Sequence, residues 1–334
     1  MKEQFDISVI MPIYNTQSYI REALESILNQ SKKNIELIAI NDGSTDKSGD
    51  IAKEYANTYS NILYLEQVNK GQGAARNVGL KNARGKYVYF MDSDDILENS
   101  ALQVLYDQCQ GYDLDMIIFD GESFYDENYI SEDKKSFKYT RNKVYGGVYN
   151  GAVLLDELIN NRDYYVSPCL YMFKKEIVMQ KGLYFPEGII HEDELFSFQL
   201  YLYANKVKHI SAVFFKRRIR GNSTMTSNNY ARSFQGYSQC LLELMDKQEI
   251  YKKDYRGDLG LVEIIIKKEL RKLYNAILRT FHGMNPSERA NYREQFRKVK
   301  SKAREQAYFG KRYGFFESNF YYFYHRLLDL KKKV

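Results

Sequence analysis

Short apolar runs and amphipathic stretches alternate along the first 120 residues of the chain. The apolar runs are rich in β-branched residues, which predicts buried strands. They lie at Ile7–Ile13, Ile35–Ile40, Ile62–Leu65, Tyr87–Met91 and Met116–Phe119. Apolar residues recur at helical spacing in Thr16–Asn29, Ala74–Ala83 and Ala101–Gln108, and Ser44–Asp46 has the hydroxyl and acid of a helix start. This alternation predicts an α/β fold with a mostly parallel sheet that is covered on both faces.

The pattern changes after residue 120. Residues 121–150 are polar and rich in Tyr, which predicts loops and one hairpin. Helices are expected at 150–160 and 192–204, and a strand at Val207–Phe215. Beyond residue 230 the patterns are long and helical, as in Leu261–Leu278, and Asn285–Glu288 has the cap, proline and glutamate of a helix start. We therefore divide the chain into an α/β domain, 1–230, and a helical C-terminal region, 231–334.

Composition and charge restrict the class of protein. Aromatic residues make up 15% of the 334 residues, far too many for a disordered chain. No run approaches the apolar length that spans a bilayer, and the charged N-terminus does not resemble a signal peptide. Three widely spaced cysteines favour a reducing compartment. We expect a soluble, cytoplasmic protein that at most rests on a membrane.

The positive charge is concentrated at the C-terminal end. The chain has a net charge of +6, and residues 297–334 hold eleven Lys and Arg against three acids. Aromatic residues are interleaved with these bases from 308 onwards. Core packing with a solvated basic edge is the first interpretation, and contact with an anionic membrane surface is the second. Binding of single-stranded nucleic acid is a distant third, and we expect no nucleic-acid partner.

Acids and one tyrosine follow three of the predicted strands. Met11–Asn15 follows the first strand, Asn41–Asp46 the second, and Asp92–Asp95 the strand that ends at Met91. Ligands of open α/β sheets bind at the carboxyl ends of the strands, so these segments are expected to share one crevice. Turns and helix caps are the alternative explanation, and for Asp46 we prefer a cap. Neighbouring carboxylates without Cys or His favour Mg²⁺ or Mn²⁺ bound with a substrate diphosphate. The chain lacks the glycine-rich motifs of dinucleotide dehydrogenases and P-loop NTPases.

Four segments together resemble the family 2 glycosyltransferases with the GT-A fold. They are Ile10–Asn15, Asn41–Asp46, Asn69–Gly79 and Met91–Asp95, in the order and spacing of that family. The resemblance covers about residues 5–225. It implies a GT-A catalytic domain, a Rossmann-like α/β fold with a mostly parallel central sheet, that transfers a sugar from a nucleoside diphosphate donor.

The resemblance also implies roles for individual residues. Pro12 and Tyr14 are expected to line the base pocket, and Asp42 to bind the nucleobase, usually uracil. Arg76 is expected near the base and the diphosphate, although an ion pair on the helix surface is the simpler alternative. Asp92–Asp94 is then the DxD motif. Asp92 is expected near the ribose and, together with Asp94, as a metal ligand, while Asp95 is expected either to support these ligands or to cap a turn. The cofactor implied is Mn²⁺ or Mg²⁺.

Acids also open the predicted helix at 192–204. Acids in a first helical turn ordinarily complement the helix dipole. The segment His191–Phe196 nevertheless resembles the ED motif of the family, whose second acid is the general base. Asp193 is then the catalytic residue, and Glu192 is its rival for this role. His191 is expected to be an orienting or a surface group rather than a metal ligand.

A basic segment, Lys216–Met225, follows the strand at Val207–Phe215. A solvated basic turn is the simple interpretation. The corresponding segment of the family closes over the donor, and Arg218 and Ser223 match the residues that contact the diphosphate. Some relatives have a histidine here that assists the metal, and this chain has none.

Together these features predict a metal-dependent transferase that inverts the sugar configuration. The expected partners are a UDP-linked sugar and a hydroxyl of a glycan or lipid-linked acceptor, used to build a cell-surface polysaccharide such as a capsule at the cytoplasmic face of the membrane. A sugar nucleotidylyltransferase of similar fold and a non-catalytic nucleotide- or glycan-binding module are the alternatives. A nucleotidylyltransferase should carry a glycine-rich loop with Arg and Lys after the first strand. The segment Pro12–Asn15 is not such a loop.

Overall fold

A mixed β-sheet forms the centre of the computed structural model, which describes residues 5–126, 138–221 and 229–305. The strands follow the order β3-β2-β1-β4-β8-β6-β9-β5, and β7 pairs with β9. Their bounds are β1 Ile7–Ile13, β2 Ile35–Asp42, β3 Ile62–Gln67, β4 Tyr87–Phe90, β5 Ile96–Leu97, β6 Met116–Tyr125, β7 Val148–Tyr149, β8 Tyr171–Lys174 and β9 Val207–Ile219. Strands β1 to β4 are mutually parallel, and β6 runs parallel to β9. The predicted α/β fold with a mostly parallel sheet is therefore confirmed.

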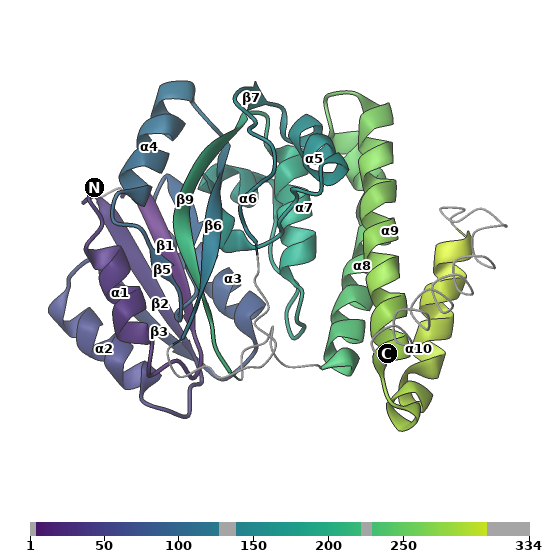
Figure 1. Cartoon of the computed structure of the whole chain (residues 1–334), viewed down its shortest axis with the longest axis horizontal. Helices are drawn as coiled ribbons and strands as arrows, with labels where there is room; N and C mark the ends of the chain where they lie inside the picture. Colours follow the sequence, from purple (N-terminus) through teal and green to yellow (C-terminus); the bar gives the residue numbers. More distant parts are fainter. Residues whose placement is uncertain (1–4, 127–137, 222–228, 306–334) are drawn as a thin grey trace, which may run out of the picture.

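Helices cover both faces of this sheet, as Figure 1 shows. Their bounds are α1 Ile20–Leu28, α2 Ser48–Thr58, α3 Gln72–Asn82, α4 Ala101–Tyr112, α5 Gly151–Asn160, α6 Lys175–Lys181, α7 Asp193–Tyr203, α8 Tyr230–Asp254, α9 Leu259–Gly283 and α10 Pro286–Glu305. Apolar side chains of α1, α2 and α4 form one core with the sheet, and those of α3, α5, α6 and α7 contribute to a second core on the opposite face. Strands β1 and β2 are buried along their whole length, as a sheet covered on both sides requires.

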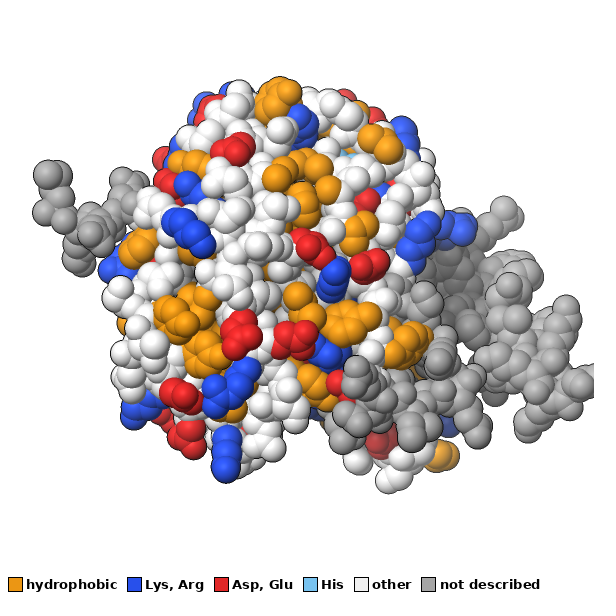
Figure 2. All heavy atoms as spheres, turned by 60° about the vertical axis from the view of Figure 1, so that its left-hand side comes forward, with side chains coloured by type: hydrophobic (Ala, Val, Ile, Leu, Met, Phe, Trp, Pro, Cys, Tyr) orange, Lys and Arg blue, Asp and Glu red, His pale blue; other side chains and the backbone are white. Residues whose placement is uncertain are grey.

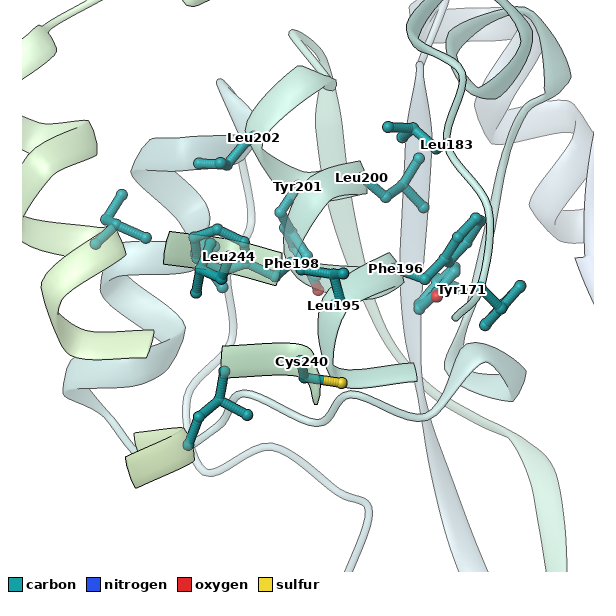
Figure 3. Close-up of a cluster of buried hydrophobic side chains, with 14 of the residues drawn as sticks. Tyr171, Leu183, Leu195, Phe196, Phe198, Leu200, Tyr201, Leu202, Cys240 and Leu244 are labelled. Atoms are coloured by element: carbon teal, nitrogen blue, oxygen red, sulfur yellow. The ribbon is translucent and has the colours of Figure 1, made fainter. Parts of the chain in front are cut away.

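The second core continues without a break into the C-terminal helices. Figure 3 shows side chains of α7, among them Leu195, Phe198 and Tyr201, gathered with Cys240 and Leu244 of α8. Helix α9 adds a further apolar face to the same cluster, including Ile265 and Leu273. Helices α8 and α9 thus pack on the α/β part through shared apolar burial, which is the main favourable term in folding.

The sequence prediction needs correction at the start of α2 and at strand β8. The helix expected to start at Ser44–Asp46 begins at Ser48, and the carboxylate of Asp46 accepts bonds from the Ser48 backbone N–H (2.9 Å) and hydroxyl. Asp46 is thus a helix-end residue as expected, but no hydroxyl side chain caps α2. Strand β8 was not predicted, because a run of four residues that includes two aromatics gives little periodicity. It lies antiparallel between β4 and β6.

The start of α10 agrees with the sequence prediction. Asn285 Oδ1 accepts the Glu288 backbone N–H at 2.9 Å, and Glu288 Oε2 accepts the Asn285 backbone N–H at 3.1 Å. Each side chain therefore satisfies one backbone donor at the helix end, which is the reciprocal capping box that the spacing predicted.

The described surface carries charges of both signs. Figure 2 shows a face on which Lys and Arg side chains are interspersed with Asp and Glu and with scattered hydrophobic residues. Among the described residues no helix has the length and apolar content needed to cross a bilayer.

Helix α8 packs its backbone directly against the segment before α7. A Cβ atom added to Gly236 would lie 1.9 Å from the carbonyl oxygen of Ile190. Only glycine fits there, since the clash is with backbone rather than with a flexible side chain. Gly111 of α4 has no atom within 4 Å of such a Cβ.

These two glycines therefore predict opposite effects of a methyl group. We expect Gly236→Ala to lower the free energy of unfolding by about 1–3 kcal/mol, because overpacking forces the helix away from Ile190. Gly111→Ala is the matched helical control and should be neutral or stabilising by about 0.4–1 kcal/mol. Urea denaturation of both variants measures this, and equal stability of the two would contradict the contact.

Candidate active site

A cleft of about 420 Å³ opens at the carboxyl ends of β1, β2 and β4. Its lining combines residues that lie far apart in the sequence, from Pro12 to Arg232. It includes Pro12, Tyr14, Asp42, Arg76, Asp92, Asp94, Asp95, Glu192, Asp193, Arg217, Arg218, Arg220 and Arg232. The expected crevice is thus present, and every predicted site residue within the described ranges lines it. Ser223 lies outside the described residues.

Hydroxyl and amide side chains bind the loops around the cleft to one another. The backbone N–H of Thr16 donates to Ser48 Oγ at 2.7 Å, and the Thr16 hydroxyl donates to Ser93 Oγ at 3.0 Å. Asn15, in the left-handed region with φ 51°, accepts the Thr45 backbone N–H on its Oδ1 at 2.9 Å. The segments after β1, β2 and β4 are therefore held as one unit, with Tyr14 at its surface and 48% exposed.

Asp42, at the end of β2, holds the segment that leads from β3 into α3. Its Oδ1 accepts bonds from Gln67 Nε2 at 2.7 Å and from the Lys70 backbone N–H at 2.8 Å. Its Oδ2 accepts the Gly71 backbone N–H at 2.9 Å. Each carboxylate oxygen has two lone pairs, so Oδ2, which accepts one bond, retains one acceptor position.

Arg76 of α3 joins the two acidic segments of the cleft. One terminal nitrogen donates to Glu192 Oε1 at 2.8 Å, and the other donates to Asp92 Oδ1 at 3.0 Å. The side chain is 3% exposed and lies over the rings of Phe90 and Phe185. Burial opposes its charge, but Asp92 and Glu192 outweigh this and raise the pKa of Arg76. The surface ion pair considered from sequence is therefore wrong, because both the arginine and its partner Glu192 are buried.

A glycine of α3 lets this bridge form. A Cβ atom added to Gly73 would lie 2.8 Å from the carbonyl oxygen of Pro186 and 2.9 Å from Cγ of Glu192. The first turn of α3 can therefore lie directly against the segment that carries Glu192. This close approach brings Arg76, one helical turn later, within reach of both acids.

The three acids after β4 have different partners. Asp92 also accepts a bond from Gln72 Nε2 at 2.7 Å, and the buried Asp95 accepts the backbone N–H of Arg218 at 2.7 Å. Asp94 accepts a bond from Arg220 Nε at 2.7 Å. Burial raises the pKa of Asp94, whereas Arg220 lowers it and Asp92 raises it further. Asp95 thus binds the backbone at the end of β9, while Asp94 pairs with the guanidinium of Arg220.

Arg218 is already engaged by the chain itself. Its Nε donates to the carbonyl oxygen of Asp94 at 3.0 Å, and its guanidinium pairs with Glu22 and lies over Tyr19 and Phe124. Arg220, which was not singled out from sequence, is the arginine of this segment that pairs with the DxD carboxylate. The pattern of four cations over five residues could not tell them apart, because all three arginines line the cleft and only long-range contacts decide which acid each one meets.

Asp193 begins α7 and is half-buried in the cleft wall. Burial and the neighbouring Glu192 and Glu194 raise its pKa to about 8, and Arg76 acts in the opposite direction. Among the described residues no ion pair of the Asp193 carboxylate occurs. Glu192, by contrast, is 5% exposed and gives one oxygen to Arg76.

His191 holds this acidic segment against α8. Its ring stacks on Tyr237 with centroids 4.0 Å apart, and its Nε2 lies 3.1 Å from Ser233 Oγ. The residue has φ 67°, and its carbonyl oxygen accepts the thiol of Cys240 at 3.4 Å. Burial lowers the pKa of His191. These contacts match the orienting role, which is one of the two alternatives that the sequence suggested for the residue.

Comparison with known proteins identifies the family. The profile of the family described as Glycosyl transferase family 2 matches residues 8–178, half of the chain. The chain belongs to glycosyl transferase family 2. This family 2 glycosyltransferase is 36% identical to glycosyltransferase GlyA of Streptococcus pneumoniae serotype 4 over 221 residues, which cover 65% of the chain and 31% of GlyA. It is 32% identical to GlyG of the same organism over 290 residues, or 80% of the chain and 93% of GlyG.

A solved structure agrees with this assignment of the fold. The crystal structure of S. aureus TarS 1-349 in complex with UDP-GlcNAc has a TM-score of 0.66 and 20% identity to this family 2 chain. The match covers 91% of this chain and 90% of that one. The expected GT-A type of α/β fold is therefore confirmed, with the C-terminal helices included in the matched length.

The raised pKa of Asp193 predicts a pH-dependent stability. Between the ordinary aspartate value and about 8, the folded protein retains a proton that the unfolded chain releases, so stability falls as pH rises through this window. Asp193→Asn removes the titrating group. The free energy of unfolding of the variant should therefore increase relative to that of the wild type between pH 5 and pH 8. Urea unfolding at both pH values measures the gain. Asp107→Asn, an exposed control, should show none, and a constant difference for Asp193→Asn would contradict the raised pKa.

Proposed function

We propose that this family 2 chain is a metal-dependent inverting transferase that moves a sugar from a UDP-linked donor to an acceptor hydroxyl. The observation that carries the proposal is the grouping of Tyr14, Asp42, the Asp92–Asp94 pair and Asp193 around one cleft. The first three suit a nucleoside diphosphate, and the fourth suits a proton acceptor. We further propose Asp193 as the catalytic residue.

The donor would occupy the end of the cleft formed by β1, β2 and β4. Tyr14 presents an exposed ring on which a base can stack, and Asp42 Oδ2 has an acceptor position for a base N–H. The uridine assignment is supported by the TarS structure, which contains UDP-GlcNAc at 20% identity. A more distant structure, a mannosyltransferase of Pyrobaculum calidifontis in complex with GDP-Man and Mn²⁺, has a TM-score of 0.51 and 15% identity. Guanosine nucleotides therefore belong in any test of the donor.

The carboxylates of Asp92 and Asp94 fit a hard divalent cation. Both present oxygen ligands to the cleft, and Asp94 already attracts the guanidinium of Arg220. Among the described residues no group of three or more His, Cys, Asp or Glu side chains could hold a metal alone, so donor phosphates would complete the coordination. When bound, Mn²⁺ or Mg²⁺ would neutralise the charge that develops on the leaving nucleoside diphosphate.

Asp193 would act on the acceptor. Its carboxylate takes the proton of the acceptor hydroxyl as that oxygen forms a bond to the anomeric carbon of the donor sugar. The bond from this carbon to the diphosphate oxygen breaks on the opposite side, and its electron pair leaves with UDP. A single displacement of this kind inverts the configuration. Glu192 is less suited to be the base, because its Oε1 is bound to the cation of Arg76.

The acceptor is proposed to belong to a cell-surface polymer, either a glycan or a lipid-linked sugar. Relatives of the chain include two proteins of minor teichoic acid biosynthesis in Bacillus subtilis, which supports this assignment. The basic residues of 297–334 would contact an anionic membrane at the cytoplasmic face. Of these, residues 306–334 lie outside the described part of the chain.

The donor site predicts selective stabilisation by a nucleotide. A ligand that binds only the folded state raises the melting temperature. At a ligand concentration of a hundred times the Kd, the free energy of unfolding rises by about 2.7 kcal/mol. We expect UDP with Mn²⁺ to raise it by several degrees in wild type and in Asp107→Asn, and not in Asp94→Asn. The panel contains UDP, GDP, CDP and TDP, each with and without Mn²⁺. No shift with any nucleotide would overturn the proposed donor site and leave a non-catalytic module as the better explanation.

The catalytic roles predict how the transfer reaction responds to substitution and pH. Asp193→Asn should reduce transfer by about 10² to 10⁴-fold while UDP still binds, since a general base contributes that much. The wild-type rate should rise with pH toward the Asp193 pKa of about 8, because the base must be ionised. NMR of the product should show the anomeric configuration inverted. A large loss in Glu192→Gln with little loss in Asp193→Asn would exchange the two roles, and a retained configuration would exclude the mechanism.

A further inference from the structure

Arginines make up most of the positive charge at the cleft. Five of them line it, namely Arg76, Arg217, Arg218, Arg220 and Arg232. The first four have partners within the chain. Arg76 pairs with Asp92 and Glu192, and Arg217 donates to the hydroxyl of Tyr139. Arg218 pairs with Glu22, and Arg220 with Asp94.

Arg232 differs from these four. It is exposed, and among the described residues no side-chain hydrogen bond or ion pair of its guanidinium occurs. Only its backbone N–H is engaged, by Asn229 Oδ1 at the start of α8. A guanidinium in this state offers paired N–H donors that match the oxygens of a phosphate or carboxylate. The cleft therefore contains a cation that no side chain in the described part of the molecule neutralises.

The position of Arg232 relates it to the acceptor rather than to the donor. Its neighbour Ser233 contacts His191, and Gly236 lies against the carbonyl oxygen of Ile190. Both contacts fix the first turns of α8 on the segment that leads into Asp193. The DxD acids and Arg220, by contrast, come from the ends of β4 and β9. Arg232 thus belongs to the wall that carries the proposed base.

We propose that Arg232 binds an anionic group of the acceptor and so selects an acidic acceptor over a neutral one. The inference rests on the proposed function, because it places the acceptor beside Asp193. The group would lie within side-chain reach of the attacked hydroxyl, and its oxygens would accept both N–H donors of the guanidinium. It could come from a phosphodiester of a polyol phosphate polymer or from the carboxylate of a uronic acid.

Binding of three defined probes in the presence of UDP and Mn²⁺ tests the proposal. The probes are a synthetic hexamer of glycerol phosphate, hexagalacturonate and neutral maltohexaose, titrated calorimetrically against wild type and three variants. We expect wild type to prefer one of the acidic probes to maltohexaose. Arg232→Gln should weaken that probe about tenfold or more, as expected for a lost charge-assisted pair. Arg232→Lys should retain part of the affinity, because it keeps the charge but loses the fork geometry.

Two controls separate this proposal from the function on which it rests. Arg256→Gln removes the same charge from the exposed α8–α9 connection, away from the cleft, and should bind every probe as wild type does. The thermal shift with UDP should persist in Arg232→Gln, which also shows that the variant is folded. Loss of the UDP shift in wild type would overturn the donor site itself. With a normal UDP shift, two results would overturn the role of Arg232 alone. Either wild type shows no preference for an acidic probe, or Arg232→Gln binds that probe as well as wild type does.

Discussion

The two ion pairs of the buried Arg76 are the interaction on which the geometry of the cleft depends. A single guanidinium binds Asp92 at the end of β4 and Glu192 before α7, two segments one hundred residues apart. Removing one partner of a buried pair costs about 3–5 kcal/mol, because a charge remains without compensation. The pairs therefore fix the distance between the proposed diphosphate end of the cleft and the proposed base. Gly73 makes the bridge possible by allowing α3 to approach the Glu192 segment.

The C-terminal helices complete the site as well as the core. Helix α8 contacts the segment before Asp193 through Gly236, Ser233, Tyr237 and Cys240. The backbone of His191 is thereby held in a conformation that few residues other than glycine adopt. This arrangement explains why an acidic residue can remain half-buried beside two further acids. The packing energy of α7, α8 and α9 offsets the electrostatic cost of placing Asp193 there.

Most of the first half of the fold could be predicted, because buried parallel strands and amphipathic helices leave distinct periods in the sequence. Strand β8 escaped prediction, since it consists of four residues held in place by β4 and β6 rather than by its own pattern. The candidate acids were found because they follow strands, and strand ends meet at one edge of the sheet. The partners of the arginines were not predictable. The acid that each guanidinium meets comes from a distant segment, such as Glu22 for Arg218 and Asp94 for Arg220.

The sequence alone determined the α/β class, the family resemblance and the residues that gather at the strand ends, since these depend on local period and spacing. The tertiary structure decided everything that depends on long-range contact. It joined Arg76 to two distant acids, paired Arg220 with Asp94 and engaged Arg218 elsewhere. It also raised the pKa of Asp193 and left Arg232 exposed at the cleft. Burial and charge pairing arise only when segments far apart in the chain meet, so no local pattern encodes them.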